Sequence, residues 1–183
     1  MPVPLFPAFL DLAGRRVLLV GGGAVARRKA EALLESGADV VVGAPTLVPE
    51  LARAVAEGRL AHRAGVFVPE WLEGAWLVIA ATDDADVNAT VAREAEARRI
   101  WANVVDDAPR CSFQVPARVE RGALQIAISS RGEAPMLARW VREKLEAELD
   151  PSLGALAEWL GSKRDALRRR FPDTARRRQV IET

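Results

Sequence analysis

Cysteine and histidine are nearly absent, because the 183 residues contain only Cys111 and His62. One cysteine cannot form a disulfide within the chain. This excludes a disulfide-stapled scaffold and fits a reducing, cytoplasmic location. His62 has no second metal-type ligand beside it, so we expect it to be structural and expect no metal site. For Cys111, which follows Arg110, we expect a buried structural thiol; the alternative is a reactive thiolate.

Long apolar runs and a charge of one sign are also missing. No stretch approaches the length of a membrane span, and residues 1–7 lack the basic region and cleavage site of a signal peptide. The formal net charge is +1, so no bulk field attracts nucleic acid or membranes. We interpret the arginine triplets at 168–170 and 176–178 as solvated helix faces rather than a nucleic-acid arm. We therefore expect a soluble protein that binds neither nucleic acid nor membrane.

A glycine-rich turn is the most informative feature that is present. An aliphatic run at residues 17–20 leads into the glycines at 21–23 and then into a helical pattern. In a dinucleotide-binding turn, Gly21 would permit the tight turn, Gly23 would let backbone approach a pyrophosphate, and Ala26 would let helix and strand pack closely. The pyrophosphate would lie at the helix N-terminus. The alternative is a glycine-rich turn that binds nothing.

Short apolar runs of strand character alternate with helical patterns over the first 105 residues. Strands are predicted at residues 16–20, 39–43, 60–62, 76–81 and 101–105, and helices at 24–36, 49–56 and 87–98. This alternation predicts an α/β protein with a Rossmann-type, doubly wound parallel sheet.

The pattern changes after Asp106. Residues 113–117 and 124–128 alternate with period two and predict a β-hairpin joined by residues 120–122. Because a two-stranded hairpin is not stable alone, it needs the preceding sheet, the following helices or a second chain as a partner. Helices are expected at residues 136–149, 152–171 and 174–181. The predicted regions are 1–112 for dinucleotide binding, 113–149 for a small α+β hairpin-plus-helix region, and 150–183 for a C-terminal helical region.

Ligands bind at the carboxyl ends of the strands in a sheet of this type. The end of the second strand, which commonly supplies an acid for the adenosine ribose, supplies Pro45 and Thr46 instead. No arginine follows immediately to hold a 2′-phosphate, so we favour NAD, with ribose contacts from these two residues. The alternative is that Pro45 and Thr46 merely start the next helix.

Two further polar segments are candidate site residues. Asp106 closes the fifth strand, where a nicotinamide ring would lie, and could serve in proton transfer. The alternative is a turn in which Asp106 and Asp107 bond the local backbone. The loop at residues 129–135 ends at a helix start, which favours anions, but an ordinary capping loop is an equal alternative.

Five motifs follow one another along the chain. They are Val20-Gly21-Gly22-Gly23-Ala24-Val25-Ala26-x-Arg28-Lys29-Ala30, Ala80-Ala81-Thr82-Asp83-Asp84, Asn103-Val104-Val105-Asp106, Cys111-Ser112-Phe113 and Ser129-Ser130-x-Gly132-x-x-Pro135-x-Leu137-Ala138-Arg139. In this order they resemble the motifs of the precorrin-2 dehydrogenase family, the N-terminal module of siroheme synthase and its free-standing relatives. The resemblance runs from Pro4 almost to the C-terminus.

The resemblance implies NAD⁺-dependent oxidation of precorrin-2, a tetrapyrrole with eight carboxylates, to sirohydrochlorin. It implies that Asp106 is the catalytic base and that hairpins and helices of two chains pair in a homodimer. The methyltransferase module fused behind some relatives is not found, so no methylation is expected. The predicted coenzyme-binding residues are Gly21, Gly22, Gly23, Ala24, Val25, Pro45, Thr46 and Thr82. The predicted tetrapyrrole-binding residues are Asn103, Ser129, Ser130 and Gly132.

Two other functions remain open at this point. Some relatives also insert Fe²⁺ into sirohydrochlorin, and Asp106 could accept the pyrrole protons in such a chelatase. A non-catalytic, NAD-sensing dimeric module is the second alternative, although it would have no need of Asp106. Which of Arg28, Arg110, Arg131 and Arg139 bind substrate carboxylates does not follow from their spacing.

Overall fold

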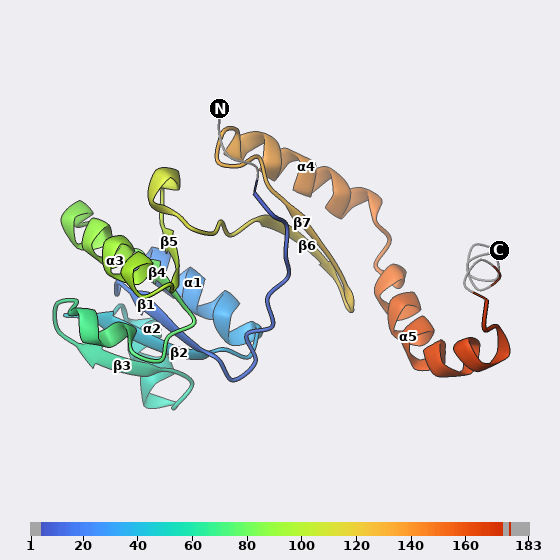
Figure 1. Cartoon of the computed structure of the whole chain (residues 1–183), viewed down its shortest axis with the longest axis horizontal. Helices are drawn as coiled ribbons and strands as arrows, with labels where there is room; N and C mark the ends of the chain where they lie inside the picture. Colours follow the sequence, from blue (N-terminus) through green and yellow to red (C-terminus); the bar gives the residue numbers. More distant parts are fainter. Residues whose placement is uncertain (1–4, 174–175, 177–183) are drawn as a thin grey trace. The chain divides into compact units, whose positions relative to one another are not determined.

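The computed structural model describes residues 5–173 and 176, and these fall into two units divided between Val115 and Pro116 (Figure 1). The first unit contains a five-stranded sheet. Its strands are β1 (Arg16–Val20), β2 (Asp39–Ala44), β3 (Ala61–Ala64), β4 (Leu77–Ala80) and β5 (Trp101–Val104). All neighbours are parallel, in the order β3-β2-β1-β4-β5. The predicted Rossmann-type sheet is confirmed. Its strand order reverses between β1 and β4, where such sheets bind ligands.

Two apolar layers hold this sheet between helices. Alternate residues of β1 face opposite sides, with Val17 and Leu19 on one and Leu18 and Val20 on the other, and all four are buried. On the first side pack α1 (Ala24–Glu35) and α2 (Pro49–Ala56), and on the second packs α3 (Ala85–Ala97). Burial on both faces explains why the central strands are uninterrupted aliphatic runs.

Local signals set the helix boundaries. Helix α1 ends at Glu35, and Gly37 follows with φ +73°, a left-handed conformation that glycine adopts without steric cost. At the start of α3, the Asp84 carboxylate accepts the backbone N–H groups of Asp86 (2.9 Å) and Val87 (3.0 Å). This side-chain cap places the first turn of α3 directly after β4.

The second unit begins with an antiparallel hairpin of β6 (Ala117–Arg121) and β7 (Leu124–Ile128). The position predicted for its first strand, 113–117, was wrong. Arg121 pairs with Leu124, so the turn has only two residues, and Gly122 has φ +54° as the first of them. This turn fixes the register and forces the partner strand through residues 117–121.

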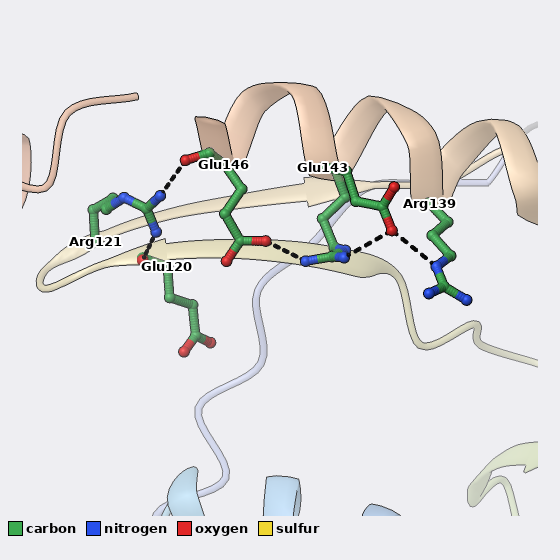
Figure 2. Close-up of polar contacts among 6 residues, drawn as sticks. Glu120, Arg121, Arg139, Glu143 and Glu146 are labelled. Atoms are coloured by element: carbon green, nitrogen blue, oxygen red, sulfur yellow. Dashed lines mark hydrogen bonds and ion pairs between the residues drawn. The ribbon is translucent and has the colours of Figure 1, made fainter. Parts of the chain in front are cut away.

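Two helices follow the hairpin, α4 (Pro135–Glu148) and α5 (Ser152–Arg170). Arg121 joins the hairpin to α4, because its guanidinium donates to the carbonyls of Glu146 (2.5 Å) and Leu149 (3.2 Å) at the helix end. Figure 2 shows the contact with Glu146. These carbonyls have no partner within the helix, so the arginine satisfies them. Figure 2 also shows Glu143 bridging two arginines of α4.

The helices predicted at 136–149 and 152–171 are observed within one residue at each end. The helix predicted at 174–181 lies outside the described residues apart from Arg176. Among the helices of the described part of the chain, none combines the length and the apolar character that crossing a bilayer requires.

Candidate functional site

A cavity of about 660 Å³ opens at the carboxyl ends of β1, β2 and β4. Every residue that we predicted to bind the coenzyme lines it. These are Gly21, Gly22, Gly23, Ala24, Val25, Pro45, Thr46 and Thr82. The cavity therefore forms where the strand order of the sheet predicts a ligand site.

Glycine is suited to each of these three positions for a different physical reason. A Cβ on Gly21, where φ is +130°, would lie 2.3 Å from the Ala81 carbonyl oxygen. A Cβ on Gly22 would lie 1.8 Å from the Thr46 carbonyl oxygen, whereas a Cβ on Gly23 would meet nothing within 4 Å. Protein packing thus requires the first two glycines but not the third. The open space at Gly23 would allow a pyrophosphate to approach the backbone closely. The residues of the turn therefore fit a dinucleotide.

The N-terminus of α1 points its unpaired N–H groups at the same place. Gly23 is the N-cap and supplies no side-chain acceptor, and the first turn contains no acid. The first helical N–H group with a hydrogen-bond partner within the helix is that of Arg27, which donates to the Gly23 carbonyl (3.0 Å). The N–H groups before it, together with the positive end of the helix dipole, are suited to an anion.

Pro45 and Thr46 do not start a helix, so that alternative was wrong. Helix α2 begins at Pro49, with Val48 as its N-cap. The Val48 N–H donates to the Gly22 carbonyl (2.8 Å), which ties this loop to the glycine turn. Pro45 and Thr46 therefore form a wall of the cavity.

Asn88, on α3, fixes the part of the cavity that follows β4, and sequence reasoning missed it. The Thr82 hydroxyl donates to Asn88 Oδ1 (2.8 Å), and Asn88 Nδ2 donates back to the Thr82 carbonyl (2.9 Å). An amide six residues after Thr82 has no distinctive spacing, so only the folded loop reveals its role. It holds Thr82 in one orientation at the cavity.

Sequence reasoning also missed the wall that follows β3. Val66 and Phe67 line the cavity, and Phe67 packs edge-on against Trp71 with ring centroids 6.1 Å apart. The Trp71 ring occupies the space over Gly43 in β2, where a Cβ would lie 2.2 Å from the ring. This contact explains the glycine that follows the three valines of β2.

Asp106 lies in a tight turn directly after β5. The Asp107 N–H donates to the Val104 carbonyl (3.2 Å), so Asp106 is the third residue of the turn, and its φ is +59°. Glycine is usual there, and an aspartate in that conformation is strained. Asp106 is exposed, and its carboxylate makes no hydrogen bond or ion pair with any described residue, whereas Asp107 pairs with Arg110.

Lys29 of α1 is a further candidate that sequence reasoning did not assign. Burial lowers its pKa, the neighbouring Arg28 lowers it further, and the charge of Asp106 opposes both effects. The ammonium group therefore lies within electrostatic reach of the turn after β5. A lysine whose pKa is lowered by burial and that interacts with a nearby carboxylate is a candidate functional residue.

Asn103 is buried in β5, with 8% of its surface exposed. Its Nδ2 donates to the Phe113 carbonyl (3.0 Å) and to Cys111 Sγ (3.4 Å). Neither Asn103 nor Asp106 lines the cavity. The hydrogen bonds of Asn103 hold the segment after β5 against the strand, and its binding of a tetrapyrrole stays a prediction.

The predicted tetrapyrrole-binding loop belongs to the second unit. The Ser129 hydroxyl accepts the Arg131 N–H (3.0 Å), and the Ser130 hydroxyl accepts the Ala134 N–H (3.1 Å) just before α4. Arg131 and Gly132 both have positive φ, +58° and +83°. These contacts shape a capping loop, and binding of substrate by Ser129, Ser130 and Gly132 stays a prediction.

His62 makes a hydrogen bond to the backbone of a neighbouring strand. Its Nε2 donates to the carbonyl of Ala44 (2.9 Å) and so joins β3 to the end of β2. Within the part of the chain that the structure describes, no group of three or more histidine, cysteine, aspartate or glutamate side chains could hold a metal ion.

Comparisons with known proteins place these features in a family. The profile described as "Putative NAD(P)-binding" matches residues 8–117, and that described as "Sirohaem biosynthesis protein central" matches residues 121–148. The siroheme synthase of Xylella fastidiosa (strain M12) is 51% identical over 180 residues, 98% of this chain. Siroheme synthase 3 of Aeromonas hydrophila subsp. hydrophila is 51% identical over 176 residues, 96% of this chain. The chain spans 38% of the length of each of these two relatives.

A solved structure titled "SirC, precorrin-2 dehydrogenase" resembles the whole chain. The TM-score is 0.79 at 30% sequence identity, and the alignment covers 97% of this chain and 88% of that one. The resemblance inferred from the motifs is confirmed. The chain belongs to the family of NAD(P)-binding sirohaem-biosynthesis proteins that includes this precorrin-2 dehydrogenase.

Proposed function

We propose that this chain is an NAD-dependent dehydrogenase that oxidises precorrin-2 to sirohydrochlorin. One observation carries the proposal: the strained, exposed Asp106 lies at the same edge of the sheet as the glycine turn. Strain at a residue that the fold does not need for packing is typical of a site kept for chemistry. The membership of the family supplies the substrate class.

The residues around the cavity bind and orient the coenzyme. The N–H groups at the start of α1, beside Gly23, hold the pyrophosphate, and Pro45 and Thr46 contact the adenosine ribose. No acidic side chain follows β2 to accept both ribose hydroxyls, and no arginine follows Thr46 directly to pair with a 2′-phosphate. We therefore assign NAD. When bound, NAD would supply the acceptor for the hydride that leaves the macrocycle.

Asp106 accepts a proton that leaves the macrocycle as it is oxidised. Its carboxylate makes no hydrogen bond or ion pair with a described residue, so a lone pair is available to the substrate. Lys29 supplies a positive charge near this carboxylate. A substrate with eight carboxylates also needs cations, and ammonium and guanidinium groups both suit that role.

A homodimer is part of the proposal. Among the described residues of the second unit, the buried hydrophobic side chains are only Val119 and Ala138. A core of this size does not stabilise a hairpin by itself. Three large apolar side chains of α4, Met136, Leu137 and Trp140, are exposed at helical spacing. Pairing of the hairpin and α4 with those of a second chain would bury them.

An anaerobic spectral assay tests the function. Purified protein is mixed with precorrin-2 and NAD⁺, and reduced nicotinamide and sirohydrochlorin are followed together. We expect both to appear in equal amounts and to appear much more slowly with NADP⁺. Absence of turnover with either coenzyme would refute the dehydrogenase proposal, and faster turnover with NADP⁺ would refute the assignment of NAD.

A further inference from the structure

The turn that carries Asp106 is held from inside by a sulfur atom. Cys111 Sγ accepts the Val104 N–H (3.2 Å) and lies 3.2 Å from the carbonyl oxygens of both Val104 and Asp107, to either of which its S–H can donate. Val104 is the first residue of the turn and Asp107 is the last. The thiol therefore contacts the backbone on both sides of Asp106.

A second contact fixes the sulfur atom itself. Asn103 Nδ2 donates to Cys111 Sγ (3.4 Å) and to the Phe113 carbonyl (3.0 Å). One buried amide therefore contacts two residues of the segment that follows the turn. The Val105 N–H donates to the Ala80 carbonyl (2.9 Å), which anchors the turn to β4 as well. The turn is thus fixed both by β4 and by the thiol.

We propose that Cys111 is a positioning residue whose thiol holds the turn after β5 and thereby fixes the carboxylate of Asp106. This inference rests on the proposed function, in which Asp106 accepts a proton. The positive φ of Asp106 requires such support, because without it the turn would relax toward conformations that an aspartate prefers. A displacement of about 1 Å at a reacting group lowers turnover by about a hundredfold.

The chemistry of the thiol suits this role. Burial raises the pKa of Cys111, so the sulfur keeps its proton near neutral pH and can both donate and accept. A thiolate could only accept, and it would face the carbonyl oxygens of Val104 and Asp107 without a proton between them. The site is therefore arranged for a neutral thiol and not for a nucleophile.

Cys111→Ala tests the proposal, with Ser112→Ala as the matched control. Ser112 lies next in the chain, and its hydroxyl accepts the Ala102 N–H (2.7 Å) at the other end of β5. We expect Cys111→Ala to lower kcat about tenfold or more and to leave the affinity for NAD within about twofold. Ser112→Ala should leave kcat unchanged. Cys111→Ser, which still donates and accepts, should fall between wild type and Cys111→Ala.

Hydrogen exchange provides a readout that does not depend on activity. The Asp107 N–H closes the turn, so its exchange should be faster in Cys111→Ala than in wild type and unchanged in Ser112→Ala. If Cys111→Ala does not fold, the same comparison is made with Cys111→Ser. Unchanged exchange at Asp107 would overturn the proposal. If wild type shows no turnover, the proposed function fails, and exchange still decides whether the thiol holds the turn.

A double-mutant cycle separates positioning from general stability. In the Asp106→Asn background no carboxylate remains to be positioned, so Cys111→Ala should cause no further loss of the residual rate. An equal loss in both backgrounds, or an unchanged kcat in Cys111→Ala alone, would overturn the proposal.

Discussion

Lys29, on α1, and Asp106, in the turn after β5, interact electrostatically across the edge of the sheet, and the carboxylate raises the pKa of the ammonium group against the larger effect of burial. Burial of a lysine without an ion pair is unfavourable. The fold thus keeps at this edge both a destabilising cation and a strained aspartate. Residues that lower stability are expected where function requires them.

Lys29→Met should therefore raise stability and impair function. Because burial lowers the pKa of Lys29, its charged form is less favourable in the folded protein than in the unfolded chain. This penalty is complete below the folded pKa and disappears as pH rises through it toward the ordinary value of 10.5. Thermal unfolding should show the variant to be more stable than wild type near neutral pH, with a difference that shrinks toward about pH 10.

The exposed Lys163 is the control for this effect, since Lys163→Met should change neither the melting temperature nor the turnover. Lys29→Met should raise the KM for the polyanionic substrate severalfold. A variant of Lys29 that is less stable than wild type near neutral pH would contradict the argument.

Gly22 and Gly23 are adjacent, yet their replacement by alanine should have opposite consequences. Gly22→Ala forces a Cβ against the Thr46 carbonyl and should lower the free energy of unfolding by about 1–3 kcal/mol. Gly23→Ala meets open space and has φ −90°, so the fold should be retained. Its methyl group would stand where the pyrophosphate approaches, so NAD should bind at least about tenfold more weakly.

Chemical denaturation and calorimetric titration with NAD measure the two effects separately. Normal coenzyme affinity in Gly23→Ala would show that the pyrophosphate does not approach this glycine.

Asp106→Gly and Asp106→Ala should both lose turnover but differ in stability. Glycine adopts φ +59° without strain, whereas alanine has the steric penalty without a polar side chain to offset it. We expect Asp106→Gly to be more stable than Asp106→Ala by about 1 kcal/mol in urea unfolding. Equal stabilities would mean that the turn is not strained.

Trp140→Glu should convert the proposed dimer into a monomer, because it places a charge on the exposed apolar surface of α4. Sedimentation velocity gives the assembly state. Trp101→Glu is the matched control, since Trp101 is also exposed but lies in the first unit at the start of β5. A dimer that survives Trp140→Glu, or a wild-type monomer, would contradict the proposed interface.

The first unit could be predicted closely because its signals are local. Residues 17–20 form an aliphatic run that ends at glycine, and aliphatic runs also make up most of β2 and β4. The hairpin was misplaced because Phe113 and Val115 alternate as a strand would. Instead the Phe113 N–H donates to the carbonyl of Ala102, a residue of β5. In β6, the charged residues on either side of Val119 obscure the alternation of apolar and polar residues.

The site was predictable only in part. Glycines, Pro45 and Thr46 were found because strand ends mark the cavity. The contacts of Asn88 with Thr82, of Trp71 with Gly43 and of Cys111 with the turn join residues whose spacing carries no signal. The strain at Asp106 is likewise a property of backbone torsion, which composition does not encode.

Turnover of precorrin-2 by Asp106→Asn, saturated with NAD⁺ and compared with wild type, tests the central claim most directly. The amide keeps the shape of the side chain and tolerates the left-handed conformation, but it cannot accept a proton as the carboxylate does. We predict that kcat falls about a hundredfold or more while coenzyme affinity and unfolding stay as in wild type. A variant that binds NAD and oxidises precorrin-2 at the wild-type rate would contradict the account.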